Sequence, residues 1–275
     1  MAVMEAGPVL SDREMQRIVQ FVYEKSGITL HDGKRALVVA RLQKRLKALN
    51  LGSYSDYLRY VEQDRSGEEI VALLDAIATN HTYFFREEQH FGILANRVVP
   101  EIRAKRKPLD LWCAASSTGE EPYTLAMTLA GAQPSIDFSI MASDISTKAL
   151  KAAQAGVYKR EGVEGLPLDV LKKHFEKGLG ESAGFVRVKQ ALRDKVQYRR
   201  LNLLEITNLD RTFDVIFCRN VMIYFDIPVQ QRVVSMLERH LRPGGYLFIS
   251  HSESLNGINH RLRWIAPAAY QAEGA

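Results

Sequence analysis

From residue 109 onward, short apolar runs alternate with helical stretches, and this alternation limits the possible folds more than any other feature. The apolar runs are "LDLWCAA", "FSIMASD", "DVIFCRN" and "GYLFIS", and the stretches between them include "EPYTLAMTLAG" and "IPVQQRVVSMLERHL". Continuously apolar strands joined by helices are typical of a parallel sheet whose two faces are both covered. We therefore expect a doubly wound, Rossmann-like α/β domain.

Four helical stretches precede this region. The first, "SDREMQRIVQFVYEKSG", begins with a capping box of Ser11 and Glu14 and ends at Gly27. It is followed by "DGKRALVVARLQKRLKALN", "SYSDYLRYVEQD" and "GEEIVALLDAIATN". Short connections without a strand pattern predict a helical bundle over residues 1–88, joined by a linker helix at 89–98 to an α/β domain at 99–275.

One stretch interrupts the α/β alternation. Val186 and Val188 alternate with Arg187 and Lys189, between glycine-rich turns. This pattern is typical of an antiparallel ribbon with one exposed face. We therefore expect a small antiparallel β insertion over residues 175–197.

The composition is that of an ordinary globular protein. A chain of 275 residues suits two domains. No apolar run approaches the roughly 18–20 residues that span a bilayer, and the first residues lack a signal-peptide pattern, so we expect a cytoplasmic protein without membrane insertion. Cys113 and Cys218 lie in apolar runs, which predicts buried thiols and neither a disulfide framework nor a metal site.

The loop "AASSTGEEP" follows the first strand of the α/β domain, where ligands of open parallel sheets bind. It contains one glycine, Gly119, and two acids, Glu120 and Glu121, but neither a G-x-G-x-x-G pattern nor a P-loop lysine. Two acids would repel a pyrophosphate, so NAD and ATP are disfavoured. S-adenosylmethionine, which has a cationic end and no phosphate, fits better. Alternatively, the acids only complement the helix dipole.

Polar residues also follow the later strands. Asp144 stands 25 residues after Gly119, at the end of "FSIMASD", where an acid usually binds ribose hydroxyls; it could instead cap the next helix. Asn202 follows the third strand and is placed to meet the adenine edge. The fourth strand leads into "RNVMIY", which lacks the Asp/Asn-Pro-Pro-Tyr/Phe pattern of nucleobase methylases.

Seven stretches in order resemble the chemotaxis receptor methyltransferases of the CheR family. They are "NHTYFFRE", "WCAASSTGEEPYTLAM", "ASDIS", "VRVKQ", "NLLE", "FDVIFCRNVMIYFD" and "HSESL". The resemblance implies a class I S-adenosylmethionine-dependent methyltransferase domain behind the helical one. It also implies methyl transfer from S-adenosylmethionine to glutamates on the cytoplasmic helices of chemoreceptors, leaving S-adenosylhomocysteine. The chain departs from many relatives at His81, where they have Glu, and at Ser116, where they have Cys.

The resemblance also implies roles for particular residues. Arg86 and Tyr224 would line the transfer site and act in catalysis. Glu121 would hold the methionine ammonium in preference to Glu120. Cofactor contacts are implied at Asn80, Thr82, Arg86, Gly119, Glu120, Glu121, Asp144, Asn202, Leu203, Arg219 and Asn220.

The implied chemistry needs few catalytic groups. A glutamate side chain with a pKa of about 4.3 is already an anionic nucleophile at neutral pH, so no general base is required. The competing hypotheses are a methylase of the same fold with a small-molecule or nucleic-acid substrate, and a cofactor-binding sensor without catalytic activity.

The second helical stretch is basic. Residues 34–47 contain six basic residues and no acid. Such a face is usually only solvated, but it would suit a glutamate-rich receptor. Nucleic acid is disfavoured as a partner, because residues 1–90 carry 12 Lys and Arg against 13 Asp and Glu. The residues expected to contact the receptor are Lys34, Arg41, Lys44 and Arg45.

Two expectations concern assembly. In some relatives the β insertion pairs with a peptide at the receptor's C-terminus by strand addition, so such a peptide is a possible second partner. We expect the chain itself to be a monomer.

Overall fold

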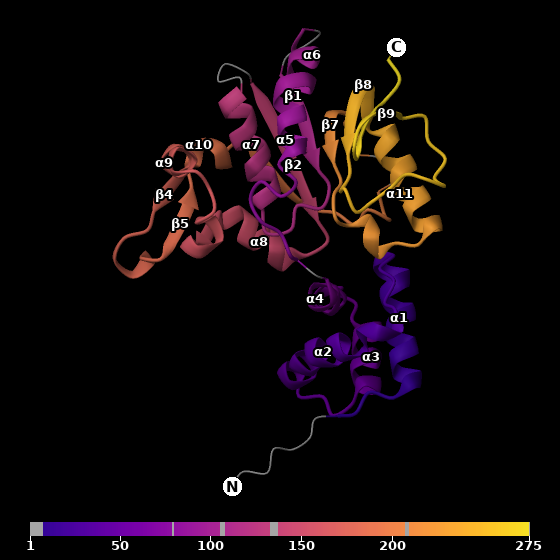
Figure 1. Cartoon of the computed structure of the whole chain (residues 1–275). Helices are drawn as coiled ribbons and strands as arrows, with labels where there is room; N and C mark the ends of the chain where they lie inside the picture. The colour runs from indigo at the N-terminus through magenta and orange to yellow at the C-terminus, as the bar shows by residue number, and fades with distance from the viewer. Residues whose placement is uncertain (1–7, 79, 105–107, 133–136, 207–208, 275) are drawn as a thin grey trace. The chain divides into compact units, whose positions relative to one another are not determined.

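The computed structural model contains two compact units (Figure 1). The first comprises Met1–Thr79 with Tyr224–Asp226, and the second comprises Asn80–Ile223 with Ile227–Ala275. The structure describes residues 8–78, 80–104, 108–132, 137–206 and 209–274.

The boundary between the units lies at residue 79, not at 88 as expected. Residues 80–88 belong to the second unit because they pack there. The Phe85 amide donates to Thr124 Oγ1 at 3.2 Å. The Phe84 ring packs edge-on against the rings of Tyr158 and Phe175, with centroids 4.9 and 5.3 Å away.

The first unit is the predicted helical bundle. The capping box of Ser11 and Glu14 is confirmed, and Gly27 ends the first helix with φ of 72°. Its helices are α1 (Asp12–Ser26), η1 (Asp32–Lys34), α2 (Arg35–Leu49), α3 (Tyr54–Gln63) and α4 (Glu68–Ile77). The spacing of Val38, Leu42, Leu46 and Leu49 predicts one apolar face for α2, and the first three are buried while Leu49 is half-buried.

A distant segment completes this unit. The Tyr23 hydroxyl donates to Asp226 Oδ2 at 2.8 Å, and the Thr29 amide donates to the Tyr224 carbonyl at 2.8 Å. These contacts explain why Tyr224–Asp226 clusters with the helices rather than with its neighbours in sequence.

The second unit contains the predicted doubly wound sheet, in the order β6-β2-β1-β7-β8-β10-β9. The pairs from β6 to β8 are parallel, whereas β10 pairs antiparallel with β8 and β9. The antiparallel β9–β10 edge was not predicted. The strands are β1 (Leu109–Cys113), β2 (Phe138–Asp144), β6 (Val196–Arg200), β7 (Phe213–Phe217), β8 (Leu241–Phe248), β9 (Arg263–Ala266) and β10 (Ala269–Gln271).

Helices cover this sheet. The expected linker helix at 89–98 is longer and belongs to the second unit, where α5 and α7 lie in front of the sheet in Figure 1. The helix beginning at residue 89 packs into one core cluster with α7 and with strand residues such as Leu111. On the other face of the sheet, the Trp112 ring contacts the His240 ring. The helices are α5 (Gln89–Ile93), η2 (Leu94–Val98), α6 (Val99–Arg103), α7 (Glu120–Ala132), α8 (Thr147–Ala155), η5 (Met222–Tyr224) and α11 (Ile227–Arg239).

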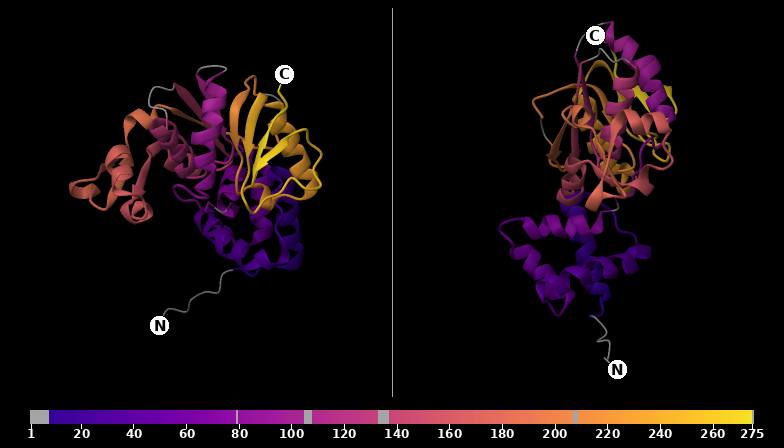
Figure 2. Two further views of the ribbon diagram at one scale, coloured as in Figure 1. Left: turned by 45° about the horizontal axis from the view of Figure 1, so that its top comes forward. Right: turned by 90° about the vertical axis from the view of Figure 1, so that its left-hand side faces the viewer.

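The β insertion is a separate three-stranded antiparallel sheet in the order β3-β5-β4, visible at the left of Figure 1 and again in Figure 2. Val186 and Val188 are buried and alternate with exposed residues, as predicted. The expected range of 175–197 is displaced, because β3 precedes it and Val196 already begins β6 of the main sheet. Its elements are β3 (Val157–Lys159), η3 (Arg160–Val163), α9 (Leu168–His174), β4 (Phe175–Lys177), η4 (Gly180–Ser182), β5 (Phe185–Val188) and α10 (Gln190–Arg193).

Within the described part of the chain, no helix has the length and apolarity needed to cross a bilayer.

Candidate active site

The loop after β1 is held in shape by its backbone. The Ala114 amide donates to the Phe217 carbonyl and the Ser116 amide to the Ser143 carbonyl, at 2.7 and 2.9 Å. This extends the sheet pairing beyond β1 on both sides. The hydroxyl oxygens of Ser116 and Ser117 are buried and have no hydrogen-bond partner among the described residues. The loop therefore retains polar atoms for a ligand.

Gly119 closes this loop, and both its conformation and its surroundings require glycine. Its φ is 99°, a region that L residues rarely adopt. An added Cβ would lie 2.8 Å from the Ala153 Cβ and 2.9 Å from the Tyr158 hydroxyl. Packing against α8 and β3 thus accounts for this glycine without a ligand contact.

Asp144 orders the turns around it. Its Oδ2 accepts from the Ser117 amide at 2.8 Å, and its Oδ1 accepts from the Ser146 amide at 2.9 Å. The N-cap of α8 is Ser146, whose hydroxyl accepts from the Ala149 amide. The alternative prediction that Asp144 caps this helix is therefore wrong, while its contact with ribose stays a prediction.

Both loop acids are in the first turn of α7, as predicted. Glu120 Oε2 accepts from Thr118 Oγ1 at 2.7 Å. Glu121 Oε2 accepts from Arg219 Nη1 at 2.8 Å, and its Oε1 accepts from Cys113 Sγ at 3.2 Å. Burial raises the pKa of both carboxyls. Glu121 keeps unused lone pairs, because each carboxylate oxygen can accept two hydrogen bonds.

Arg219 links the loop to the segment before α5. Its side chain is fully buried and forms ion pairs with Glu121 and, at 3.0 Å, with Glu87. It also donates to the Arg86 carbonyl at 2.6 Å. A buried cation of this kind is stable only when its hydrogen bonds and charge are matched. Arg219 therefore positions Glu121, while its buried Nε has no hydrogen-bond partner among the described residues, and its contact with the cofactor stays a prediction.

Sequence reasoning assigned Glu87 no role, although it lies in the quoted stretch "NHTYFFRE". Ser250, the last residue of "GYLFIS", and Glu253 of "HSESL" were missed in the same way. Ser250 Oγ donates to Glu87 Oε1 at 2.7 Å, and Asn220 Nδ2 donates to Ser250 Oγ at 2.7 Å. Glu253 Oε1 accepts from the amides of Val221 and Met222 at 2.9 and 2.8 Å. These contacts hold Asn220 at the end of β7, where its φ is 57°.

The segment before α5 carries the remaining predicted contacts. Arg86 Nη1 donates to the His81 carbonyl at 2.9 Å, and its guanidinium lies 5.8 Å from the centre of the Tyr83 ring. Arg86 and Thr82 are partly exposed and Asn80 is exposed. All three side chains are thus accessible to a ligand.

Asn202 and Leu203 follow β6 and are almost completely buried. The Leu201 amide donates to the Asp144 carbonyl at 3.1 Å, and Asn202 Oδ1 accepts from the Leu204 amide at 3.1 Å. The turn after β6 is therefore tied to the end of β2. Asn202 and Asp144 lie at the same edge of the sheet, as the strand order predicts.

The predicted substrate contacts, Lys34 at the end of η1 and three residues of α2, separate into two pairs. Arg41 Nη1 donates to the carbonyls of Ala76, Ile77 and Ala78, at 2.7 to 3.0 Å. Arg45 Nε donates to Glu69 Oε1 at 3.0 Å. These arginines hold α2 against α4, whereas Lys34 and Lys44 are exposed. Tyr224, the second predicted catalytic residue, belongs to the same helical unit.

A doubly wound sheet with acids after β1 and β2 is compatible with an S-adenosylmethionine-dependent methyltransferase. Comparison with known families agrees. Residues 13–78 match the all-alpha domain of CheR methyltransferases, and residues 80–270 match their S-adenosylmethionine-binding domain. The chain belongs to the CheR methyltransferase family, and its cofactor is S-adenosylmethionine.

Relatives match almost the whole chain. A chemotaxis protein methyltransferase of Klebsiella aerogenes is 42% identical over 253 residues, which cover 91% of this chain and 86% of the relative. One from Escherichia coli is 41% identical over 92% of this chain and 88% of its own length. Chemotaxis protein methyltransferase 2 of Pseudomonas aeruginosa is 40% identical over 94% of this chain and 92% of its own length.

Proposed function

We propose that the protein is a protein-glutamate O-methyltransferase that methylates glutamate side chains on the cytoplasmic helices of chemoreceptors. The observation that supports this most directly is the similarity of both units, over more than nine-tenths of the chain, to chemotaxis protein methyltransferases. A monomer in the cytoplasm fits this role, because the receptor helices to be methylated are there.

The side chains at the site fit this chemistry. Bound S-adenosylmethionine supplies the methyl group on a sulfonium, and a glutamate carboxylate is already ionised at neutral pH. The protein therefore has to orient the two reactants, which can contribute roughly 7–11 kcal/mol to lowering a barrier. Arg219 is already paired with two carboxylates. Arg86 donates to the neutral His81 carbonyl rather than to a carboxylate, so it is the better candidate to steer the substrate carboxylate.

We assign the cofactor contacts as follows. Glu121 holds the methionine ammonium and is itself anchored by Arg219. Asp144 binds the ribose, while Asn202 and Leu203 meet the adenine. The remaining contacts are Asn80 and Thr82 over the site, Gly119 and Glu120 in the loop, and Asn220 at the methionine end.

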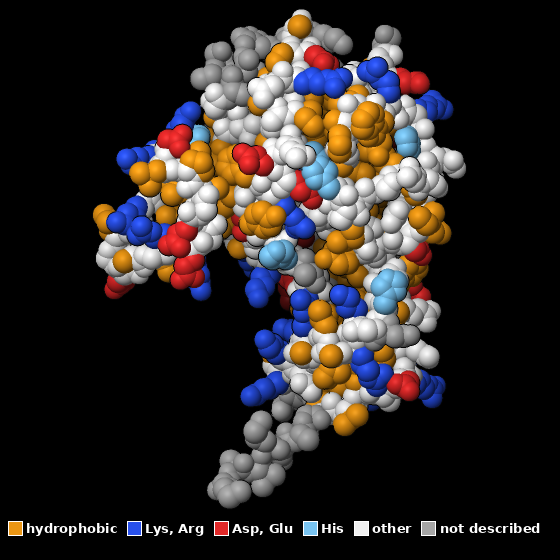
Figure 3. Space-filling view, in the orientation of Figure 1, with side chains coloured by type: hydrophobic (Ala, Val, Ile, Leu, Met, Phe, Trp, Pro, Cys, Tyr) orange, Lys and Arg blue, Asp and Glu red, His pale blue; other side chains and the backbone are white. Residues whose placement is uncertain are grey.

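For the receptor we propose two contact regions. Figure 3 shows Lys and Arg side chains gathered over the side of the helical unit that carries α2, where Lys34, Lys44 and Lys47 are exposed. Receptor methylation regions are rich in glutamate, so these lysines suit them. The β insertion, with β3 and β4 as its edge strands, is the candidate for adding a receptor C-terminal peptide as a further strand.

A labelling experiment tests the reaction. Purified protein is incubated with methyl-labelled S-adenosylmethionine and receptor-containing membranes, and label released by alkali as methanol is measured. A carboxyl methyl ester is base-labile, so release confirms the proposal. Label that is transferred but stable to alkali would point to another acceptor, and absence of transfer would support a cofactor-binding sensor.

A further inference from the structure

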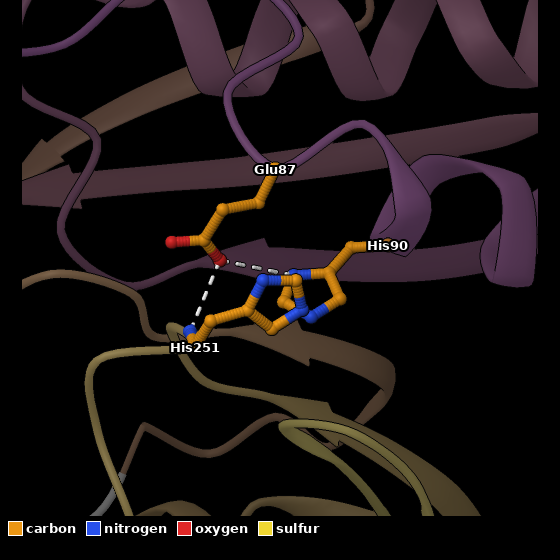
Figure 4. A group of neighbouring side chains, drawn as sticks. All are labelled: Glu87, His90 and His251. Carbon is orange, nitrogen blue, oxygen red and sulfur yellow. Dashed lines mark hydrogen bonds and ion pairs between the residues drawn. The ribbon is translucent and has the colours of Figure 1, made fainter.

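Glu87, His90 and His251 form a cluster that the proposed cofactor contacts do not use (Figure 4). Glu87 lies just before α5, His90 is in the first turn of α5, and His251 follows β8. Their potential ligand atoms all lie within 4.8 Å of one another. Glu87 lies outside the helix, with φ of 55°, and its Oε2 lies 3.5 Å from His90 Nδ1. The segment after β8 adds His251 to the same space.

His90 is the informative member. Its side chain is completely buried, and its Nε2 lies 3.3 Å from the Pro267 carbonyl oxygen. A carbonyl oxygen only accepts, so Nε2 carries the proton and donates. Nδ1 then presents its lone pair to Glu87 Oε2 at 3.5 Å and has no hydrogen-bond partner among the described residues. Glu87 Oε2 also pairs with the Arg219 guanidinium and accepts from the His251 amide, so it is the His90 Nδ1 lone pair that faces this carboxylate without a donor of its own.

With Nε2 bonded to the Pro267 carbonyl, the buried Nδ1 lone pair is the atom that His90 can offer to a metal ion.

The surroundings of the cluster also resemble those of a metal site. Metal-binding histidines characteristically donate their second nitrogen to a carbonyl or carboxylate, as His90 does to Pro267. The carboxylate is oriented in the same way, because Ser250 Oγ donates to Glu87 Oε1 at 2.7 Å. Two of the three ligands are thus already held in place.

We propose that Glu87, His90 and His251 bind a divalent transition metal of the zinc class. Two imidazoles and one carboxylate with an open fourth position are a ligand set of zinc, whereas magnesium and calcium prefer oxygen ligands. Zinc lies about 2.0–2.2 Å from such ligands, so ligand atoms that are now up to 4.8 Å apart must move closer together when the ion binds. The exposed side chain of His251 can make this movement.

Such a cation would compete with Arg219. Glu87 Oε2 is paired with the Arg219 guanidinium at 3.0 Å. A dication at Glu87 repels the guanidinium and leaves Glu121 as its sole acidic partner. If Glu121 holds the cofactor's ammonium, as proposed above, the metal and the cationic cofactor weaken each other's binding. Linkage requires this antagonism to be reciprocal.

Zinc binding to the full-length protein tests the site itself. Calorimetric titration should show one saturable zinc site, with magnesium chloride as the negative probe. His251→Ala leaves the His251 amide and its 3.2 Å contact with Glu87 intact, so the variant should fold, which circular dichroism checks. Its zinc affinity should fall by more than about tenfold, since even outer partners of metal ligands contribute roughly 10–100-fold.

The matched control is His31→Ala, which removes an exposed histidine of the helical unit and should leave zinc affinity unchanged. Equal zinc affinity in His251→Ala and the unsubstituted protein, or no saturable site in the latter, would overturn the proposal.

A second titration tests the competition. The affinity for S-adenosylmethionine is measured with and without saturating zinc. Zinc should weaken cofactor binding in the unsubstituted protein and leave it unchanged in His251→Ala. If zinc binding depends on His251 but does not alter cofactor affinity, the zinc site is supported and the competition with Arg219 is refuted. Neither result tests whether the receptor is the substrate.

Discussion

Arg219 shows how one buried side chain can organise a site. It joins Glu121, from the first turn of α7, to Glu87, before α5, and its guanidinium lies 5.5 and 5.9 Å from the ring centres of Phe91 and Phe217. The aromatic surroundings exclude water and strengthen both ion pairs. Glu121 is consequently a fixed acceptor, which suits an amino group that must be oriented on binding.

Arg86 differs from Arg219 because its charge is partly exposed, and its role can be tested by substitution. Arg86→Ala should reduce turnover by about a hundredfold, which corresponds to roughly 2.7 kcal/mol of transition-state stabilisation. Cofactor affinity should fall by less than about tenfold, since the other proposed contacts remain. Methyl transfer and equilibrium binding of cofactor are the two measurements. Unchanged turnover would refute the assignment, and Arg86→Lys shows whether charge alone suffices.

Gly119 provides a test of the loop. Gly119→Ala places a Cβ within 2.9 Å of Ala153 and Tyr158 at a φ of 99°. The strain and overlap should lower the free energy of unfolding by roughly 1–3 kcal/mol. Urea denaturation measures this.

Gly131→Ala, in the helix α7 that follows Gly119, is the matched control. No heavy atom lies within 4 Å of its added Cβ, and alanine is favoured over glycine in a helix by about 1 kcal/mol. The control should therefore be slightly more stable. Equal behaviour of the two variants would contradict the packing role of Gly119.

At the scale of elements, the basic residues of α2 either hold it against α4 or remain exposed to a partner, and the sequence does not show which residue does which. Arg41 caps the C-terminal end of α4, because its guanidinium donates hydrogen bonds to carbonyls that a helix end leaves unpaired. Arg45 pairs with the nearly buried Glu69. Only the exposed lysines of this region are available to a partner.

This division gives opposite outcomes for two sets of variants. The double substitution Lys34→Glu and Lys44→Glu should raise the apparent KM for receptor membranes several-fold and change stability by no more than about 0.5 kcal/mol. Arg45→Met should instead destabilise the protein by about 2–3 kcal/mol, below the 3–5 kcal/mol of a fully buried pair. Methylation kinetics and thermal unfolding separate the two effects. A normal KM in the lysine variant would exclude this face from receptor binding.

At the scale of the whole molecule, ion pairs near the amino-terminal ends of β1, β7 and β8, away from the candidate active site at their carboxyl ends, hold the sheet together. Asp110 of β1 pairs with Arg211 before β7 and with Arg242 of β8, at 2.7 and 2.8 Å, and Arg242 also pairs with Asp214 of β7. Although burial acts to raise the pKa of Asp110, hydrogen bonds from Arg242, Ser139 and Arg211 lower it overall.

The stability contribution of Asp110 is therefore present above the ordinary pKa of about 3.9 and is lost as the pH falls through the lowered pKa of the folded state. Asp110→Asn should lower the free energy of unfolding by about 1.5–3 kcal/mol at pH 7. The difference from the unsubstituted protein should shrink below pH 4. Unfolding curves between pH 3 and 7 measure it, and a difference independent of pH would show that charge is not involved.

The sequence by itself determined the order and type of the elements, the capping box of α1, the buried stripe of α2, the loop acids at the start of α7 and the family. These depend on local patterns and on motifs of a few consecutive residues. Domain limits were less accurate, because residues 80–88 are assigned by the core they join rather than by their own composition.

Only the tertiary structure decided which charges are paired and which groups are buried. The bond from Arg219 to Glu87 and the meeting of His90 with His251 join residues far apart in the chain, and the distinction between Arg45 and Lys44 depends on where α4 packs. Pairing and burial are set by neighbours in space, and a side chain's pKa, its availability to a ligand and its contribution to stability follow from those neighbours.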